Sequence, residues 1–298
     1  MKSIIHTIII SVVEYSAMRV ISASEIRASV ALLVQKANFE LGNDVLELLK
    51  KAIQAEQSPI GRDILEKIIL NASIAKTDRV PLCQDCGTAV IFLEIGQEVH
   101  ISGGDLYEEL TNGVRLGYQE GFLRKSIVSQ PFTSRINTGD NTPPVIHAEI
   151  VPGEQLKISF MPKGGGSENM SRLVMLQPSA GRRGIVDAVT AAVKDAGGNP
   201  CPPLIIGLGI GSTAEKAMVM SKRALLRPAG QPSIDPEVAC LEEELLKSIN
   251  SLGIGPLGMG GKVTALAVHA DVLPCHFASL PLSISFQCHS IRHAEVLL

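Results

Sequence analysis

The sequence predicts an α+β fold in which a helical N-terminal portion packs against a mixed β-sheet core. Apolar residues recur at helical spacing through roughly the first third of the chain. From residue 89 onward the pattern changes to short strand-like runs that are interspersed with further helices. With 298 residues, 45% of them hydrophobic, the chain can bury a sizeable core. No internal repeat or linker divides it, which favours one mixed domain.

The first third is expected to contain helices at 22–56 and 60–76. A serine begins the first, Glu25 falls in its first turn, and Gly42 with Asn43 interrupts it. Pro59 precedes the second. The runs 89–96 and 98–102 then read as short strands, and 106–121 returns to helical spacing.

The remaining two thirds combine turn-rich stretches with regular elements. Turns are expected at 137–147, 161–169 and 196–203, where Gly, Pro and Asn gather. Strands are expected at 154–161, 203–211, 262–272 and 280–288, and helices at 184–198, 213–226 and 236–253.

Residues 1–17 are expected to be an extension outside the fold, so that a single domain covers 18–298. Lys2 precedes an apolar run there, as in a signal peptide, but His6 interrupts the run and no clear cleavage site follows. No other segment approaches the roughly 18 apolar residues of a membrane span. The prediction is a cytoplasmic protein.

Charge and cysteine content narrow the function classes. The net charge is −3 with no block of like charge, which argues against nucleic acid or an anionic membrane as partner. Six cysteines in a chain of this length are too sparse for a disulfide scaffold. Thiols that serve as ligands fit this pattern better than bridges do.

The stretch "PLCQDCGTAV" holds Cys83 and Cys86 in a CxxC arrangement. A structural zinc site needs four ligands, and no second pair of that kind exists. A redox pair normally lies where a strand meets a helix, whereas this pair precedes an expected strand. The remaining readings are two buried cysteines that act as small hydrophobes, or an anchor for a group assembled from distant segments.

Two further cysteines are candidates for such an assembled group. Cys201 lies between prolines in "GGNPCPP", and Cys288 ends an expected strand. Together with Cys83, three thiolates could hold an iron–sulfur cluster and leave one iron without a protein ligand. An open iron is a Lewis acid that can bind a substrate hydroxyl or carboxylate. Cysteine spacing alone leaves this as one reading among several.

Two glycine-rich stretches could bind anions. In "PKGGGSEN", successive amides around Gly165 could form a nest for a carboxylate or phosphate, or the run is an ordinary turn capped by Ser167. In "GLGIGST" the position of the third fingerprint glycine is Ser212, so close strand–helix packing is favoured over dinucleotide binding.

Two more side chains are open to either a functional or a structural reading. His276 lies in the turn-like stretch "LPCHFASLP", which favours function over a buried structural histidine. Arg124 is either a carboxylate clamp or a surface charge.

Taken together, the motifs resemble one family. The stretches "CQDCGTAV", "NTGDNTPPVIHAEIVPG", "PKGGGSENMS", "AGGNPCPPLIIGLGIG", "LGIGPLGMGGK" and "CHFASLP…FQCHSIRHAE" look like successive signatures of the class I fumarase family of iron–sulfur hydro-lyases. They are most similar to the α subunit of its two-subunit form, and the L-tartrate dehydratase α subunit shares the same framework. The similarity begins near Ser24 and continues to the C-terminus.

The resemblance implies a [4Fe–4S] cluster and a set of substrate contacts. Cys83, Cys201 and Cys288 would be its ligands. Substrate contacts would come from Gln84, Asp85, Arg124, the Gly165 amide and His276, with Asp85 and His276 in catalytic roles. The family more often has threonine at the positions of Cys86 and Cys275, so both are extra thiols.

The resemblance also implies partners and a reaction. The cluster's iron would act as Lewis acid in the reversible hydration of fumarate to (S)-malate. The general base would come from a separate β subunit, in a hetero-oligomer of α2β2 type with a small dicarboxylate substrate. Tartrate dehydration is the alternative reaction. A non-catalytic iron–sulfur redox sensor is the alternative from another class, suggested by the absence of an evident base and by the extra thiols.

Overall fold

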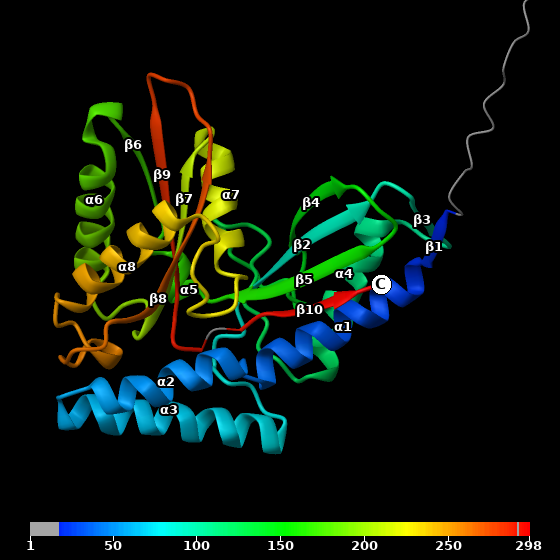
Figure 1. Ribbon diagram of the computed structural model, residues 1–298. Helices are drawn as coiled ribbons and strands as arrows, with labels where there is room; N and C mark the ends of the chain where they lie inside the picture. The colour runs from blue at the N-terminus through cyan, green and yellow to red at the C-terminus, as the bar shows by residue number, and fades with distance from the viewer. Residues whose placement is uncertain (1–17, 291) are drawn as a thin grey trace, which may run out of the picture.

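A computed structural model describes residues 18–290 and 292–298, so the expected extension 1–17 lies outside the described residues. Helices and strands together confirm the mixed α and β content (Figure 1). The helices are α1 (Ala23–Phe39), α2 (Asn43–Ala55), α3 (Pro59–Asp78), α4 (Leu106–Glu120), α5 (Gly165–Glu168), α6 (Gly181–Ala196), α7 (Ala214–Ala224) and α8 (Pro236–Asn250). The strands are β1 (Arg19–Ser22), β2 (Thr88–Gly96), β3 (Val99–Ser102), β4 (Val145–Val151), β5 (Leu156–Lys163), β6 (Arg172–Leu176), β7 (Leu204–Gly211), β8 (Ala265–Leu273), β9 (Leu280–Gln287) and β10 (Ala294–Leu297).

Capping residues, a proline and a glycine set the ends of the N-terminal helices. The Ser22 hydroxyl accepts a hydrogen bond from the Glu25 amide and caps α1. Ser58 caps α3 in the same way, and Pro59 occupies the first helical position, where no amide hydrogen is needed. The chain leaves helical geometry between α1 and α2, as Gly42 predicts.

One four-stranded sheet has the order β10-β5-β2-β4 and is covered by helices on both faces. Alternate residues of β2 point to opposite sides: Ala89, Ile91 and Leu93 pack with α1 and α4, whereas Val90 and Phe92 pack with α2 and α3. Because β5 pairs antiparallel to β2, its last residue, Lys163, lies opposite Thr88. This register brings the triglycine stretch beside the CxxC loop.

A second four-stranded sheet has the order β6-β9-β7-β8, and α6 and α8 bury their apolar faces on one side of it (Figure 1). Helix α7 packs against β7 from the other side. A Cβ atom at Gly207 or Gly209 would lie 2.0 Å from a backbone oxygen of α7, so these positions accept only glycine. The predicted close strand–helix packing is thereby confirmed.

The sequence patterns missed four short strands. The stretch 137–147 was expected to be a turn, yet β4 begins at Val145 and pairs in parallel with β2. Pro143 and Pro144 hide this start because proline interrupts strand patterns. The strands β1, β6 and β10 have only four or five residues each, too few to establish an alternating pattern.

Across the described ranges, none of the helices is both long and apolar enough to cross a membrane.

Candidate functional site

Three of the six cysteines lie at the ends of neighbouring elements. Cys83 precedes β2, Cys201 precedes β7, and Cys288 directly follows β9. Strand β9 runs antiparallel to β7, with Gln287 opposite Ile205. The end of β9 and the start of β7 therefore lie at the same edge of the sheet, which brings Cys288 and Cys201 together.

The Cys201 turn is joined directly to the Cys288 segment. Cys201 has a φ of 57°, in the left-handed region, and its amide donates to the Gly198 carbonyl at 3.0 Å. Its carbonyl oxygen lies 3.2 Å from the backbone nitrogen of His289 and 3.1 Å from that residue's Nδ1. Both thiols are thus presented from one hydrogen-bonded unit.

Asp85 joins the Cys83 loop to the triglycine turn. Its Oδ1 accepts from the Gly87 amide at 2.9 Å, and its Oδ2 accepts from the Gly165 amide at 2.7 Å. The second contact spans 80 residues of sequence. Two amide donors to one carboxylate fix both loops, because hydrogen bonds to an ionised acceptor are stronger than neutral ones.

Arg292 joins the C-terminal segment to the same loop. The side chain is 1% exposed, and its Nη1 donates to the Asp85 carbonyl at 3.0 Å and to Asn38 Oδ1 at 3.3 Å. Its Nε is buried and has no hydrogen-bond partner among the described residues. A buried guanidinium with an unused donor beside the thiols is suited to an anionic group bound there.

The three thiols influence one another electrostatically. Burial raises the pKa of the Cys201 thiol, and the Cys288 and Cys83 thiols raise it further. Burial likewise raises the pKa of Cys288, with Arg292 opposing and Cys83 reinforcing the shift. Within the described part of the chain, no three His, Cys, Asp or Glu side chains lie close enough to bind a single metal ion. The three thiols therefore affect one another's pKa values without forming such a group.

Cys86 is oriented differently from Cys83. It is 1% exposed, and its Sγ lies 3.8 Å from the Cys83 carbonyl and accepts from the Arg124 amide at 3.3 Å. Tyr118 donates its hydroxyl to the Cys86 carbonyl at 2.6 Å, and burial raises the pKa of the Cys86 thiol. Cys86 is thus a buried residue that packs under the Cys83 loop and helps to hold its backbone in place.

The expected substrate contacts are brought together only in part. Gln84 is exposed beside Cys83, and the Arg124 backbone lies against Cys86 with its side chain exposed. The Gly165 amide, expected to hold a substrate carboxylate, donates its one hydrogen to Asp85. Asp85 in turn has both oxygens engaged by amides, so the structure gives these two residues a mutual contact.

His276 is not brought to the thiols of its own chain. It lies exposed in the loop between β8 and β9, at the opposite end of β9 from Cys288 (Figure 1). The eight residues of β9 separate the two ends by roughly 25 Å at the rise of an extended strand. The resemblance implies a substrate contact for His276, and β9 places this side chain away from Cys288 of the same chain.

Sequence reasoning missed three residues at this site. Arg292 and His289 join the segments, and Lys163 lies 1% exposed beneath the triglycine turn. All three lie inside the quoted motifs. The available signal was a basic residue within an otherwise glycine-rich or apolar stretch.

Comparisons with known proteins show which family the chain belongs to. The sequence pattern of the family described as "Fumarate hydratase (Fumerase)" matches residues 27–297. A protein of Methanocaldococcus jannaschii named "Putative L(+)-tartrate dehydratase subunit alpha" is 43% identical over 88% of this chain and 93% of its own length. The "L(+)-tartrate dehydratase subunit alpha" of Escherichia coli O157:H7 is 31% identical over 90% and 89%. The chain therefore belongs to the fumarate hydratase family of hydro-lyases.

Proposed function

We propose that the chain is the cluster-bearing α subunit of a hydro-lyase that interconverts fumarate and (S)-malate, with Cys83, Cys201 and Cys288 as ligands of a [4Fe–4S] cluster. The supporting observation is the convergence of three thiols from three distant segments, joined by the contacts of Arg292 with Asp85 and of His289 with Cys201. A cubic cluster usually takes four thiolates. Three leave one iron open.

The donor set fits such a cluster better than a single ion. Thiolates are the usual ligands of iron–sulfur centres, and a four-iron cube separates its ligands more widely than one ion does. The pKa of Cys201 responds to both Cys288 and Cys83, which supports a common site for the three thiols. The unused Nε of Arg292 offers a donor to a cluster or thiolate sulfur.

The chemistry follows from the residues around the thiols. When bound, the cluster supplies a Lewis-acidic iron that makes the substrate hydroxyl a feasible leaving group. Arg124 is exposed beside the Cys83 loop and is available to pair with a substrate carboxylate. The side-chain amide of Gln84 can donate a hydrogen bond to the same carboxylate. Asp85 holds the two loops in register, so its contribution is to fix these groups rather than to remove a proton.

The general base and part of the substrate site are proposed to come from other chains. The named relatives are α subunits, which supports a β subunit as partner in an α2β2-type assembly. His276 lies too far from Cys288 to act within its own chain. If His276 contacts substrate, it does so at the thiols of a second copy.

L-tartrate is the second candidate substrate, because the similar proteins named above are tartrate dehydratase α subunits. Tartrate carries one more hydroxyl than malate. To prefer tartrate, the enzyme needs a polar group that hydrogen-bonds this extra hydroxyl. The same group would be left unpaired when malate binds. A redox-sensing role at Cys86 is less well supported, since a sensing thiol needs exposure and a low pKa, whereas this thiol is buried and its pKa is raised. The other extra thiol, Cys275, is exposed.

The test is anaerobic reconstitution of the chain with iron and sulfide, followed by iron analysis and an EPR spectrum with and without malate or L-tartrate. We expect about four irons per chain and a spectrum that the true substrate perturbs. Addition of the β subunit should then give turnover of that substrate. Failure of the wild-type chain to take up iron would contradict the proposal.

Serine variants assign the ligands. Replacing Cys83, Cys201 or Cys288 with serine should abolish the visible absorbance of the cluster. Cys240→Ser is the matched control, because Cys240 lies exposed on α8 and contacts Arg182. Retention of iron by Cys201→Ser together with its loss from Cys240→Ser would refute the ligand set.

A further inference from the structure

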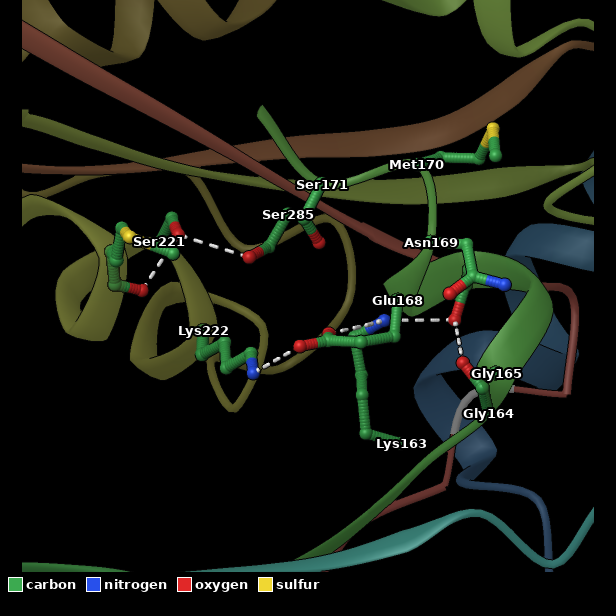
Figure 2. Close-up of polar contacts among 12 residues, drawn as sticks. Lys163, Gly164, Gly165, Glu168, Asn169, Met170, Ser171, Ser221, Lys222 and Ser285 are labelled. Atoms are coloured by element: carbon green, nitrogen blue, oxygen red, sulfur yellow. Dashed lines mark hydrogen bonds and ion pairs between the residues drawn. The ribbon is translucent and has the colours of Figure 1, made fainter. Parts of the chain in front are cut away.

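A lysine is buried beneath the triglycine turn. Lys163 ends β5, and its side chain is 1% exposed although it carries an ammonium group. Figure 2 shows it reaching toward Glu168, with Gly164 and Gly165 alongside. Burial of an unpaired ammonium costs several kcal/mol, so its surroundings must compensate the charge.

The ammonium fixes the turn through Ser167. Its Nζ donates to Ser167 Oγ at 2.8 Å, and that hydroxyl donates to the Gly164 carbonyl at 3.0 Å. Because an ammonium is only a donor, the hydroxyl must accept from it and point its own hydrogen at Gly164. The next residue, Gly165, holds Asp85 at 2.7 Å. Lys163 is thus two hydrogen bonds from the backbone that positions the Cys83 loop.

The charges near Lys163 do not balance. Glu168 lies 3.4 Å from Lys163 and 2.6 Å from Lys222, so one carboxylate serves two ammonium groups. Burial lowers the pKa of Lys163 to about 8, Lys222 lowers it further, and Glu168 and the Cys288 thiol oppose that shift. The group remains largely protonated at neutral pH. One positive charge is left over beneath the turn whose Gly165 amide holds Asp85 of the Cys83 loop.

We propose that Lys163 is an electrostatic positioning residue of the cluster site, whose buried positive charge offsets the negative charge of the thiolates and the cluster. This inference rests on the proposed cluster and adds to it a determinant of the reduction potential. Net charge around an iron–sulfur cluster is among the factors that set its potential. Reduction adds a negative charge, so a nearby cation favours the reduced form.

The test measures the midpoint potential of the reconstituted cluster in four variants of the full chain. Lys163→Met removes the charge and should shift the potential to more negative values, with about tenfold weaker iron retention. Lys163→Arg keeps the charge and should keep the wild-type potential. Ser167→Ala removes the hydroxyl link but leaves the charge, so it too should keep that potential. Lys157→Met is the control, because Lys157 lies on the same strand and pairs with Glu295.

The outcomes separate the possible failures. If Lys163→Met takes up the cluster at the wild-type potential, the electrostatic role is wrong and the proposed function still stands. If Ser167→Ala shifts the potential as far as Lys163→Met does, the role is structural and the inference falls. If the wild-type chain takes up no cluster, the proposed function itself fails. Lys163→Gln, which can still donate to Ser167, replaces the methionine variant if that does not fold.

Discussion

The two ends of β9 differ in how many contacts their residues make with distant parts of the chain. At the Cys288 end, three chain segments meet and Arg292 and Asp85 are held by hydrogen bonds to distant residues. At the other end, the loop that carries His276 makes mostly local contacts: the His276 carbonyl accepts from the Ser279 amide, and its Nδ1 accepts from the Ala278 amide. Phe277 beside it is 89% exposed.

In the proposed assembly, the chain would build one part of its site alone and complete the other part against a second chain. Among the described residues around Cys288, Arg292 Nε and Glu168 Oε2 are the buried side-chain atoms that lack a hydrogen bond, and Glu168 Oε2 still pairs with Lys163 at 3.4 Å. An imidazole and an exposed phenylalanine at the opposite end gain a defined environment only against another surface. Substitutions at the Cys288 end should therefore change iron binding or stability of the isolated chain, whereas substitutions at the His276 end should change turnover or assembly.

The largest effect is expected from His276. His276→Asn should lower turnover of the assembled enzyme by about 100-fold, the typical contribution of one acid–base group. The iron content and spectrum of the chain should not change, because β9 separates His276 from Cys288. The measurement is steady-state turnover beside iron analysis of the same preparation.

Mixing two inactive variants tests whether His276 acts across chains. Co-assembly of His276→Asn with Cys288→Ser in equal amounts would create sites with an intact cluster from one copy and His276 from the other. Random pairing in a two-fold dimer restores roughly a quarter of wild-type turnover. No recovery in mixed assemblies would mean that His276 has no role at a second copy's thiols.

Local sequence signals predicted most of the secondary structure. Ser22, Pro59 and the glycines of β7 act within a few residues or through close packing, so their effects are visible in the sequence. The family motifs likewise pointed to three thiols that influence one another's pKa values in the structure, and their role as cluster ligands stays a prediction.

Long-range contacts were not predictable in the same way. No local pattern shows that Asp85 will meet the Gly165 amide, since the β2–β5 register creates that contact. The buried positions of Lys163 and Arg292 depend on three segments packing together. The separation of His276 from Cys288 likewise depends on β9, because an extended strand converts a short sequence interval into a long distance.

The next effect concerns Asp85. Asp85→Asn keeps the shape of the side chain but replaces one carboxylate oxygen by an NH2 group, which then faces a backbone amide donor. The free energy of unfolding should therefore fall by about 2 kcal/mol. Urea unfolding of the cluster-free chain gives this value. Asp63→Asn is the control, since Asp63 forms an exposed pair with Lys67 and should cost under about 0.5 kcal/mol. Unchanged stability with lost turnover would instead make Asp85 a catalytic group.

The smallest effect on the isolated chain is expected from Phe277→Ser. The ring is 89% exposed, and its centroid lies 4.9 Å from that of His276. The free energy of unfolding should therefore change by less than about 0.5 kcal/mol, as for other surface substitutions. Assembly should weaken measurably in sedimentation, because an aromatic side chain at an interface is a frequent source of binding energy.

Measuring both stability and assembly for Phe277→Ser and for Asp85→Asn gives the sharpest comparison of the two ends of β9. A variant that lowers stability but not assembly belongs to the end of β9 that the chain completes by itself, and one that lowers assembly but not stability belongs to the other. If Phe277→Ser destabilised the isolated chain by more than 1 kcal/mol, a value above the surface range, the loop would pack against its own chain. The contrast between the two ends would then be lost, and His276 would have to be explained within a single chain.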